Sequence, residues 1–338
     1  MESRLPENQL SENRLIDRHG RRHSYLRISV TDRCNLRCTY CMPPQGIDWT
    51  PRADILTADE IVRLGGIFVG MGINKIRLTG GEPLSRRDIG EIAMRLGALP
   101  GVRTLAMTTN GISLAERAQK LRDAGMTSLT ISLDTLKRDR FREIAKRDQF
   151  IAVMDGIEAA LAAGFAPLKI NVVVMRGVND DEILDFVDWA KDRPIDVRFI
   201  EYMPFPDNHW SKGGLMPYAE MRTLIGQRYE LIPVIGAATD VGKDFRIAGH
   251  SGMVSFVTSM TVSFCGGCNR LRVTADGNIK SCLFHPAEQS LRDAMRAGAP
   301  DSEIERLILS AVDGKPAAHP PMEELMKMKN RNMIEIGG

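Results

Sequence analysis

Short runs of β-branched and other apolar residues alternate along this chain with longer stretches in which apolar residues recur about every 3.6 positions. The runs predict six β-strands, and the longer stretches predict helices between most of them. Such a pattern is typical of a parallel sheet with right-handed crossovers, so the expected fold class is α/β. It favours neither an open sheet nor a closed or partial barrel. The predicted strands cover residues 26–30, 75–78, 104–108, 128–133, 168–174 and 196–202.

A few local signals predict helix boundaries. Thr57 with Glu60, and Ser113 with Glu116, have the spacing of capping boxes, so we expect helices to begin there. Gly125 predicts a helix end.

The sequence pattern changes after residue 206. Residues 217–229 predict one more helix, 230–262 lack the alternation of strands and helices, and two further helices are expected at about 288–296 and 301–312. Residues 1–23 are polar and lack apolar periodicity, so we expect a poorly ordered arm. We therefore predict this arm (1–23), a first domain (24–240) and a C-terminal domain (241–338).

Polar and glycine-rich segments directly follow successive predicted strands. In α/β barrels the carboxyl ends of the parallel strands carry the active site, so we expect these segments to meet there. They cover residues 34–41, 80–83, 109–111, 134–135 and 203–204.

The six cysteines form two groups of three. The first has the spacing C-x₃-C-x₂-C within a polar loop that contains Arg33, Asn35 and Arg37. Three thiolates are one short of a tetrahedral zinc site, but they suit a [4Fe–4S] cluster with one iron left open. The alternatives are a zinc knuckle with a distant fourth ligand, or buried cysteines that serve as small apolar residues. This group is Cys34, Cys38 and Cys41.

The second group has the spacing C-x₂-C-x₁₃-C. A predicted hairpin with Asp276-Gly277 at its turn carries the last cysteine back toward the first two. His285, three residues after the last cysteine, leaves a structural Cys₃His zinc site open as the alternative. This group is Cys265, Cys268 and Cys282.

Composition narrows the classes of protein to which the chain could belong. The 338 residues are 43% hydrophobic and 26% charged, and the net charge of +2 gives no overall attraction to nucleic acid or membranes. We expect no transmembrane helix and no signal peptide, and odd-numbered cysteine groups then indicate metal binding in a reducing cytoplasm. Arginines gather near the N-terminus, where they could bind a phosphorylated ligand or form a solvated basic surface: Arg18, Arg21, Arg22, Arg27, Arg33 and Arg37.

Taken together, these motifs resemble a known family. The first triad with Tyr40, followed one strand later by Gly80-Gly81-Glu82-Pro83, resembles the signature of radical S-adenosylmethionine (SAM) enzymes. The second triad, the segments 201–204 and 269–272, and the terminal Gly-Gly resemble the GTP 3′,8-cyclase family of molybdenum-cofactor biosynthesis. The resemblance runs from about residue 15 to the end and implies a partial (β/α)₆ barrel with a smaller C-terminal α+β region.

The resemblance also implies cofactors and site residues. It implies SAM and two [4Fe–4S] clusters, one on each cysteine triad, the second with its open iron on the guanine of GTP. The residues implied for SAM are Tyr40, Gly81, Ser132 and Met203, and those implied for GTP are Arg27, Arg77, Thr108, Lys169, Arg270, Leu271 and Arg272. Those implied in catalysis are Arg27, Arg198, Arg270, Gly337 and Gly338.

Two of these expectations have independent support from the sequence pattern. Arg270 and Arg272 alternate along one predicted strand, so both side chains should point to the same face. For Arg77 a solvated charge remains an alternative.

By resemblance, the first cluster cleaves SAM to a 5′-deoxyadenosyl radical that removes the ribose 3′ hydrogen of GTP, and the product is 3′,8-cyclo-7,8-dihydro-GTP. The implied partners are a reduced flavodoxin- or ferredoxin-type electron donor and the downstream cyclic pyranopterin monophosphate synthase, and a homodimer is compatible with the family. Two alternatives stay open: another radical-SAM enzyme with an auxiliary cluster, such as a peptide maturase, and a zinc-binding structural or nucleic-acid-binding protein.

Overall fold

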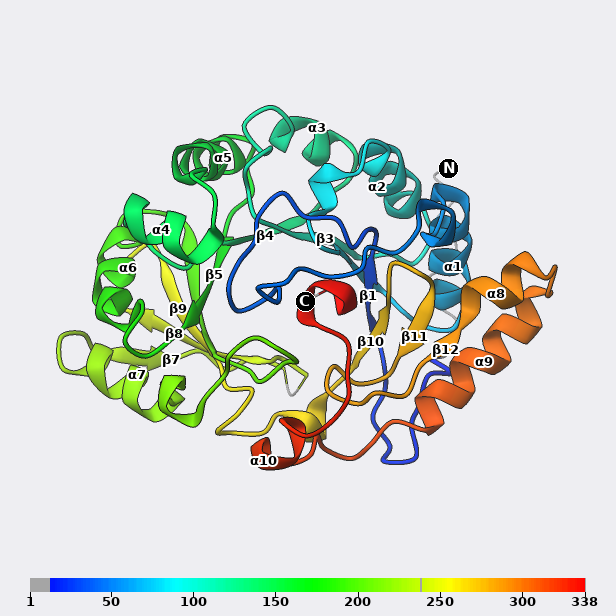
Figure 1. Ribbon diagram of the computed structural model, residues 1–338. Helices are drawn as coiled ribbons and strands as arrows, with labels where there is room; N and C mark the ends of the chain where they lie inside the picture. The colour runs from blue at the N-terminus through cyan, green and yellow to red at the C-terminus, as the bar shows by residue number, and fades with distance from the viewer. Residues whose placement is uncertain (1–12, 238, 338) are drawn as a thin grey trace, which may run out of the picture.

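The computed structural model describes residues 13–237 and 239–337, and within it six parallel strands curve around a lumen (Figure 1). They pair in sequence order from β1 to β6. All six predicted strands are confirmed to within one residue at each end, and so is the partial (β/α)₆ barrel. The strands are β1 (Tyr25–Ser29), β2 (Lys75–Thr79), β3 (Thr104–Thr109), β4 (Ser128–Ser132), β5 (Leu168–Val174) and β6 (Ile195–Glu201).

Helices cover the outer face of this sheet (Figure 1). They are α1 (Ala58–Gly70), α2 (Ile89–Gly97), α3 (Ala118–Asp123), α4 (Arg138–Ala145), α5 (Phe150–Ala162), α6 (Ile183–Trp189) and α7 (Tyr218–Gly226). The capping box at Thr57 and Glu60 is confirmed. The helix end at Gly125 is also confirmed, since α3 stops two residues before it.

The capping box predicted at Ser113 and Glu116 is wrong. Helix α3 begins only at Ala118, and Leu114 instead lies fully buried beneath α5. Burial of Leu114 holds residues 112–117 in turns, so the tertiary contact overrides the local signal.

The C-terminal third extends the barrel sheet at both edges. Next to β1 lie β10 (Arg270–Val273), which is parallel to it, and then β11 (Asn278–Lys280) and β12 (Gln289–Ser290). Next to β6 lie β9 (Met253–Val257), β8 (Gly242–Ile247) and β7 (Leu231–Pro233). The predicted boundary at 240/241 therefore falls between two strands of one continuous twelve-stranded sheet.

Four further helices follow the strands of the C-terminal third. Helices α8 (Leu291–Arg296) and α9 (Asp301–Asp313) confirm the two that we predicted. They pack against α1, with ion pairs from Arg296 to Glu60 and from Arg63 to Asp301. The chain ends in α10 (Met322–Leu325) and α11 (Met333–Ile336), and the last turn lies in the middle of the barrel (Figure 1).

The two-residue period of the strands separates core from lumen. In β1, Leu26 and Ile28 are fully buried in the apolar core, whereas Tyr25 and Arg27 face the lumen. Strand β5 alternates in the same way, so that Lys169, Asn171 and Val173 are turned away from the core.

The expectation of a poorly ordered arm is wrong for residues 13–23. Leu15 and His23 are fully buried, and the buried Asp17 carboxylate accepts a 2.6 Å hydrogen bond from Arg21 Nε. A buried ion pair with further partners can hold a segment that lacks apolar periodicity. Residues 1–12 of the predicted arm lie outside the described residues.

Within the described residues, no helix combines the length and apolar character needed to cross a membrane.

Candidate active site in the barrel lumen

Three cavities meet inside the barrel, and Arg27 and Asn171 line all three. The largest, about 440 Å³, is strongly polar. A cavity of about 200 Å³ contains the first cysteine triad, and one of about 170 Å³ contains the second. The lumen therefore connects both triads with a polar chamber.

The first triad lies in the loop after β1. Cys34, Cys38 and Cys41 line one cavity and are free thiols despite their short spacing. The loop is held to the end of α4 by hydrogen bonds from the Arg37 N–H to the Ala145 carbonyl (3.0 Å) and from the Thr39 N–H to the Ile144 carbonyl (3.1 Å). These contacts hold the backbone that presents the three sulfurs.

The first triad is strongly desolvated. Burial raises the pKa of Cys34 to about 11, and burial, followed by the charge of Asp134, raises that of Cys38. Burial also raises the pKa of Asp134 to about 6. These thiols stay protonated at neutral pH until a positively charged group displaces their protons.

The segment after β2 closes against the cysteine loop. The Gly81 N–H donates to the Thr31 carbonyl at 2.7 Å, and a Cβ on Gly81 would overlap the carbonyl oxygens of Asp32 and Arg33. Only glycine therefore permits this approach. Glu82 does not line the cavity. Its buried carboxylate accepts hydrogen bonds from Leu84, Thr109 and Asn110, so it holds the loops together and is not available to bind an ammonium group of a ligand.

The other residues expected to bind SAM are brought together with the first triad. Tyr40, Ser132 and Met203 all line the same 200 Å³ cavity. Asn208 Nδ2 donates to the carbonyl oxygens of Met203 (2.9 Å) and Tyr40 (3.3 Å), and so ties the loop after β6 to the cysteine loop. The sequence reasoning missed Asn208.

The C-terminal tail enters this cavity. Gly337 lines it together with Met333 and Ile334 of α11. Gly337 has φ +84°, and an added Cβ would lie 2.8 Å from both Ser29 Cβ and Thr79 Oγ1. Glycine is thus required at this position by conformation and by space. Gly338 lies outside the described residues.

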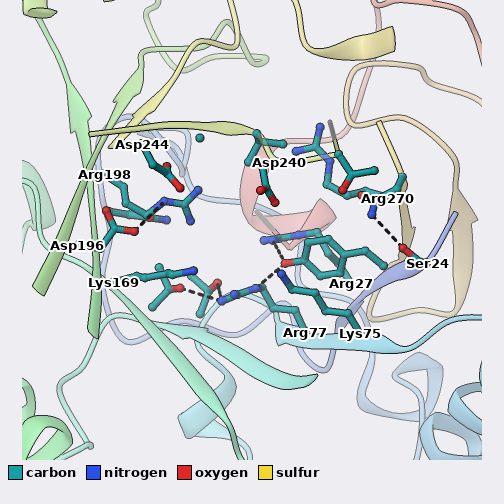
Figure 2. A pocket seen from close by; sticks show the side chains of 18 of the residues that line it. Ser24, Arg27, Lys75, Arg77, Lys169, Asp196, Arg198, Asp240, Asp244 and Arg270 are labelled. Carbon is teal, nitrogen blue, oxygen red and sulfur yellow. Dashed lines mark hydrogen bonds and ion pairs between the residues drawn. The ribbon is translucent and has the colours of Figure 1, made fainter. Parts of the chain in front are cut away.

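The largest of the three lumen cavities is cationic (Figure 2). Six basic and three acidic side chains line it among the described residues, and in Figure 2 Lys169 and Arg198 approach from one side while Arg27, Lys75 and Arg77 approach from the other. An excess of positive charge in a chamber of this size suits a small polyanion. The charged residues are Arg27, Lys75, Arg77, Lys169, Arg198 and Arg270 with Asp196, Asp240 and Asp244.

Arg77 is held by four hydrogen bonds from its guanidinium. Its side chain is 5% exposed, which overturns the alternative of a solvated charge. Nε donates to the Tyr25 hydroxyl (2.6 Å), while Nη1 donates to the Met107 carbonyl (3.0 Å) and to the hydroxyls of Thr108 (3.2 Å) and Thr130 (2.9 Å). Among the described residues none accepts a bond from Nη2, and this atom is not buried, so one edge of the guanidinium is available to the cavity.

Crowding and burial destabilise the positive charges. Burial, followed by repulsion from Arg198, lowers the pKa of Lys169. Burial lowers the pKa of Arg27 to about 10, and burial, followed by the charges of Arg27 and Arg270, lowers that of Arg272 to about 9. An anionic ligand would reduce this charge repulsion, so the lumen favours binding of an anion.

The second triad flanks the predicted hairpin, with Cys265 and Cys268 before its first strand and Cys282 after its second. Strands β10 and β11 pair antiparallel with Gly277 at the turn, as predicted. Cys265, Cys268 and Cys282 line the 170 Å³ cavity. Arg270 and Arg272 line it too, as their shared face of β10 predicted, whereas the Leu271 side chain lies fully buried in the core on the opposite face.

Neither triad has the arrangement of a single-ion site. Among the described residues, no group of three or more His, Cys, Asp or Glu side chains is placed to hold one metal ion. His285, the fourth zinc ligand of the alternative, does not line the cavity, and its Nδ1 accepts a 3.2 Å hydrogen bond from the Ala287 N–H. The structure therefore gives the Cys₃His zinc site no support.

Comparison with known proteins identifies the family of this chain. A sequence profile for the radical SAM superfamily matches residues 28–190, and one described as Molybdenum Cofactor Synthesis C matches residues 195–321. The mitochondrial GTP 3′,8-cyclase of Arabidopsis thaliana is 52% identical over 96% of this chain and 83% of its own length. The GTP 3′,8-cyclase of Moorella thermoacetica is 45% identical over 95% of this chain and 99% of its own.

The chain belongs to the GTP 3′,8-cyclase family of radical SAM proteins. It is also 50% identical to human molybdenum cofactor biosynthesis protein 1 over 95% of this chain, but it spans only 51% of that longer protein. The fold neighbours include Streptococcus suis SuiB bound to its precursor peptide SuiA, with a TM-score of 0.61, 16% identity, and coverage of 94% of this chain and 72% of SuiB. At this identity the likeness shows the fold alone.

In this member of the family, three further residues of the site were missed from the sequence: two line the lumen, and the third contacts the second triad. Lys75 lies on β2 two residues before Arg77, and Asn171 lies on β5 two residues after Lys169. Strand periodicity could have found both, because residues two apart share a face. Lys315, in contrast, reaches Cys268 from a loop 47 positions away, and no local signal predicts that contact.

Proposed function

We propose that this protein cyclises GTP to 3′,8-cyclo-7,8-dihydro-GTP, the first step of molybdenum-cofactor biosynthesis. The meeting of the three cavities at Arg27 and Asn171 carries the proposal, because it joins a radical-SAM cysteine triad to a cationic chamber and a second triad. The names of the relatives from Arabidopsis thaliana and Moorella thermoacetica agree with it.

The first triad fits a [4Fe–4S] cluster with SAM. Its donor set is three free thiols facing one cavity, and Gly81 leaves backbone space beside them. Tyr40, Ser132 and Met203 would complete the SAM site. When bound, this cofactor pair supplies the radical that removes a hydrogen atom from the ribose.

The second triad fits another three-thiolate [4Fe–4S] cluster. Cys265, Cys268 and Cys282 face one cavity with Arg270 and Arg272, and the proposal places the guanine of GTP there. The donor set leaves one iron position without a thiolate, which a substrate atom could occupy.

The chain's own residues bind and orient the nucleotide. The proposal assigns the triphosphate to the cationic chamber, where Arg77, Lys169 and Arg27 can make charge-assisted hydrogen bonds to it. Thr108 accepts a bond from Arg77, and so helps to hold that guanidinium. The side chain of Leu271 is in the core, so it cannot contact GTP. Its backbone lies between the two arginines of β10, and the proposal assigns the contact with GTP to this backbone.

Three arginines and the tail would act on the reacting centre. Arg27 lies at the junction of the cavities, and Arg198 and Arg270 each line both the cationic chamber and the second-triad cavity. We assign them electrostatic or proton-holding roles. Gly337 would close the SAM cavity and exclude water. For Gly338 the proposal keeps the catalytic role that the resemblance implies.

The proposal extends to partners and compartment. A reduced flavodoxin- or ferredoxin-type protein would supply electrons, and a cyclic pyranopterin monophosphate synthase would take the product. Six free thiols agree with a reducing compartment such as the cytoplasm. A homodimer is part of the same proposal.

The test is anaerobic reconstitution followed by incubation with SAM, GTP and a reductant. We expect about eight iron atoms per chain if both clusters fill, and we expect the cyclised nucleotide together with 5′-deoxyadenosine. Cys265→Ala should retain SAM cleavage and lose cyclisation. Cyclisation unaltered in Cys265→Ala would refute the role of the second triad, and SAM cleavage that ignores GTP but responds to a peptide would favour the maturase alternative.

A further inference from the structure

Tyr25 lies among the cations of the largest lumen cavity. It opens β1, two residues before Arg27, and therefore shares the lumen-facing side of that strand. Its hydroxyl oxygen accepts hydrogen bonds from Arg77 Nε (2.6 Å) and Arg27 Nη1 (3.3 Å), and Lys75 Nζ lies 4.6 Å from the centre of its ring. One aromatic side chain thus contacts three of the six cations that line the chamber.

The contacts are charge-assisted. Although burial opposes ionisation, the charges of Arg77, Arg27 and Lys75 lower the pKa of Tyr25 to about 6. The oxygen is thus a strong acceptor for both guanidiniums, and it screens two like charges that face each other in a desolvated space.

The same contact orients Arg77 toward the cavity. Four hydrogen bonds from Nε and Nη1 hold the guanidinium. Nε donates to the Tyr25 hydroxyl, and the three bonds from Nη1 go to other residues. With these two nitrogens occupied, Nη2 is the edge that remains for a ligand. A guanidinium fixed in this way loses little conformational entropy when it binds a phosphate.

We propose that Tyr25 is a positioning residue for the polyphosphate end of the nucleotide, which it serves by holding Arg77 and Arg27 in the orientation that receives phosphate oxygens. The inference rests on the proposed function, since it takes GTP as the ligand of this chamber. The proposed function assigns Tyr25 no contact with SAM or GTP. We therefore expect it to act through the two arginines.

The experiment compares binding of GTP and guanosine to the anaerobically reconstituted protein by titration calorimetry. Tyr25→Phe keeps the ring beneath Lys75 but removes the oxygen. We expect GTP to bind about tenfold more weakly, because the two charge-assisted hydrogen bonds that orient Arg77 and Arg27 are lost, while guanosine affinity stays unchanged. The matched control is Tyr218→Phe, whose ring lies beneath Lys243 and lines none of the three cavities.

A double-mutant cycle separates positioning from a general structural effect. Arg77→Lys keeps the charge but cannot make the same bonds. If Tyr25 acts through Arg77, adding Tyr25→Phe to Arg77→Lys should weaken GTP binding much less than Tyr25→Phe does alone. The cycle is read on folded variants, checked by equal iron content and by guanosine affinity.

The outcomes are distinct. Wild-type protein that binds no GTP would overturn the proposed function itself. Wild-type protein that binds GTP, with Tyr25→Phe binding it equally well, would overturn only the inference. Equal weakening for GTP and guanosine, or effects of Tyr25→Phe and Arg77→Lys that simply add, would also overturn it.

Discussion

Lys315 Nζ lies 3.3 Å from the Sγ of Cys268. The lysine is 2% exposed, and its ammonium group also donates to the Arg270 carbonyl at 2.8 Å. Although burial opposes it, the charges of Arg270 and Lys315 lower the pKa of Cys268 to about 6. The second triad therefore contains a thiol prepared for ionisation, whereas burial raises the pKa of the Cys34 thiol in the first triad to about 11.

Removing this lysine should impair the second triad alone. In Lys315→Met the Cys268 thiolate loses a hydrogen-bond donor and a neighbouring positive charge, so it becomes a poorer ligand. We expect iron after anaerobic reconstitution to fall from about eight toward about four atoms per chain, measured with acid-labile sulfide. Lys243→Met is the control, because Lys243 lies over the ring of Tyr218 and lines none of the three cavities. Full iron content in Lys315→Met would contradict the prediction.

The two triads should differ in their reaction with iodoacetamide when the protein is free of clusters. At pH 7 a thiol with a pKa of about 6 is roughly nine-tenths thiolate, whereas one with a pKa of about 11 is almost wholly protonated. Both Cys268 and Cys34 are half-buried, so we expect Cys268 to be labelled at least about tenfold faster.

The labelling of the two cysteines should respond to pH in different ranges. Lowering the pH from 7 to 5 protonates Cys268 and should slow its labelling, while Cys34 should gain reactivity only as the pH rises toward 11. Labelling is measured by mass spectrometry of proteolytic peptides, with denatured protein as the reference for full reactivity. Equal rates in both triads at pH 7 would show that the difference in environment has no chemical effect.

A methyl group on Gly337 should displace the tail from the SAM cavity. Gly337→Ala places a Cβ 2.8 Å from Ser29 Cβ and Thr79 Oγ1, at a φ of +84° that costs alanine about 1 kcal/mol. We expect at least a tenfold loss of turnover, with iron content and GTP affinity retained. Gly90→Ala is the matched control, since an added Cβ there meets no atom within 4 Å. Normal turnover in Gly337→Ala would remove the tail from the mechanism.

His23 should make the fold sensitive to mild acid. Burial, followed by the charge of Lys315, lowers its pKa from 6.5 to about 4, so the folded chain keeps it neutral at pH values where the unfolded chain protonates it. Stability is therefore lost as the pH falls from 6.5 toward 4, and between pH 7 and pH 5 the loss from this group is about 2 kcal/mol.

The comparison is urea unfolding of wild-type protein and His23→Gln at pH 7 and pH 5, on reconstituted samples. Other titrating groups contribute alike to both proteins, so the difference between their pH dependences isolates His23. The variant should be less stable at pH 7 but should lose less stability on acidification. Parallel losses in the two proteins would contradict the buried, neutral histidine.

Much of the barrel and of its site follows from local pattern. Strand ends are predicted within a residue because a buried parallel strand needs a continuous β-branched run, and the two-residue period places Arg27 and Lys169 in the lumen. The hairpin turn at Gly277 and the shared face of Arg270 and Arg272 follow from the same short-range geometry.

Other features were decided by contacts between distant segments. Leu114 delays α3 because it packs beneath α5, and residues 13–23 are held by the Asp17–Arg21 ion pair rather than by apolar periodicity. The twelve-stranded sheet depends on which strand of the C-terminal third meets β1 and which meets β6. Local propensity carries no information about such pairings.

The sequence by itself determined the two cysteine triads, the six-stranded core and most of the lumen cations, because spacing and alternation act over a few residues. Only the tertiary structure decided that Arg27 and Asn171 join three cavities, that Tyr25 holds two arginines and that Lys315 reaches Cys268. The physical reason is that hydrogen bonds and charge interactions depend on distance in space, and folding brings together residues that lie far apart in the chain.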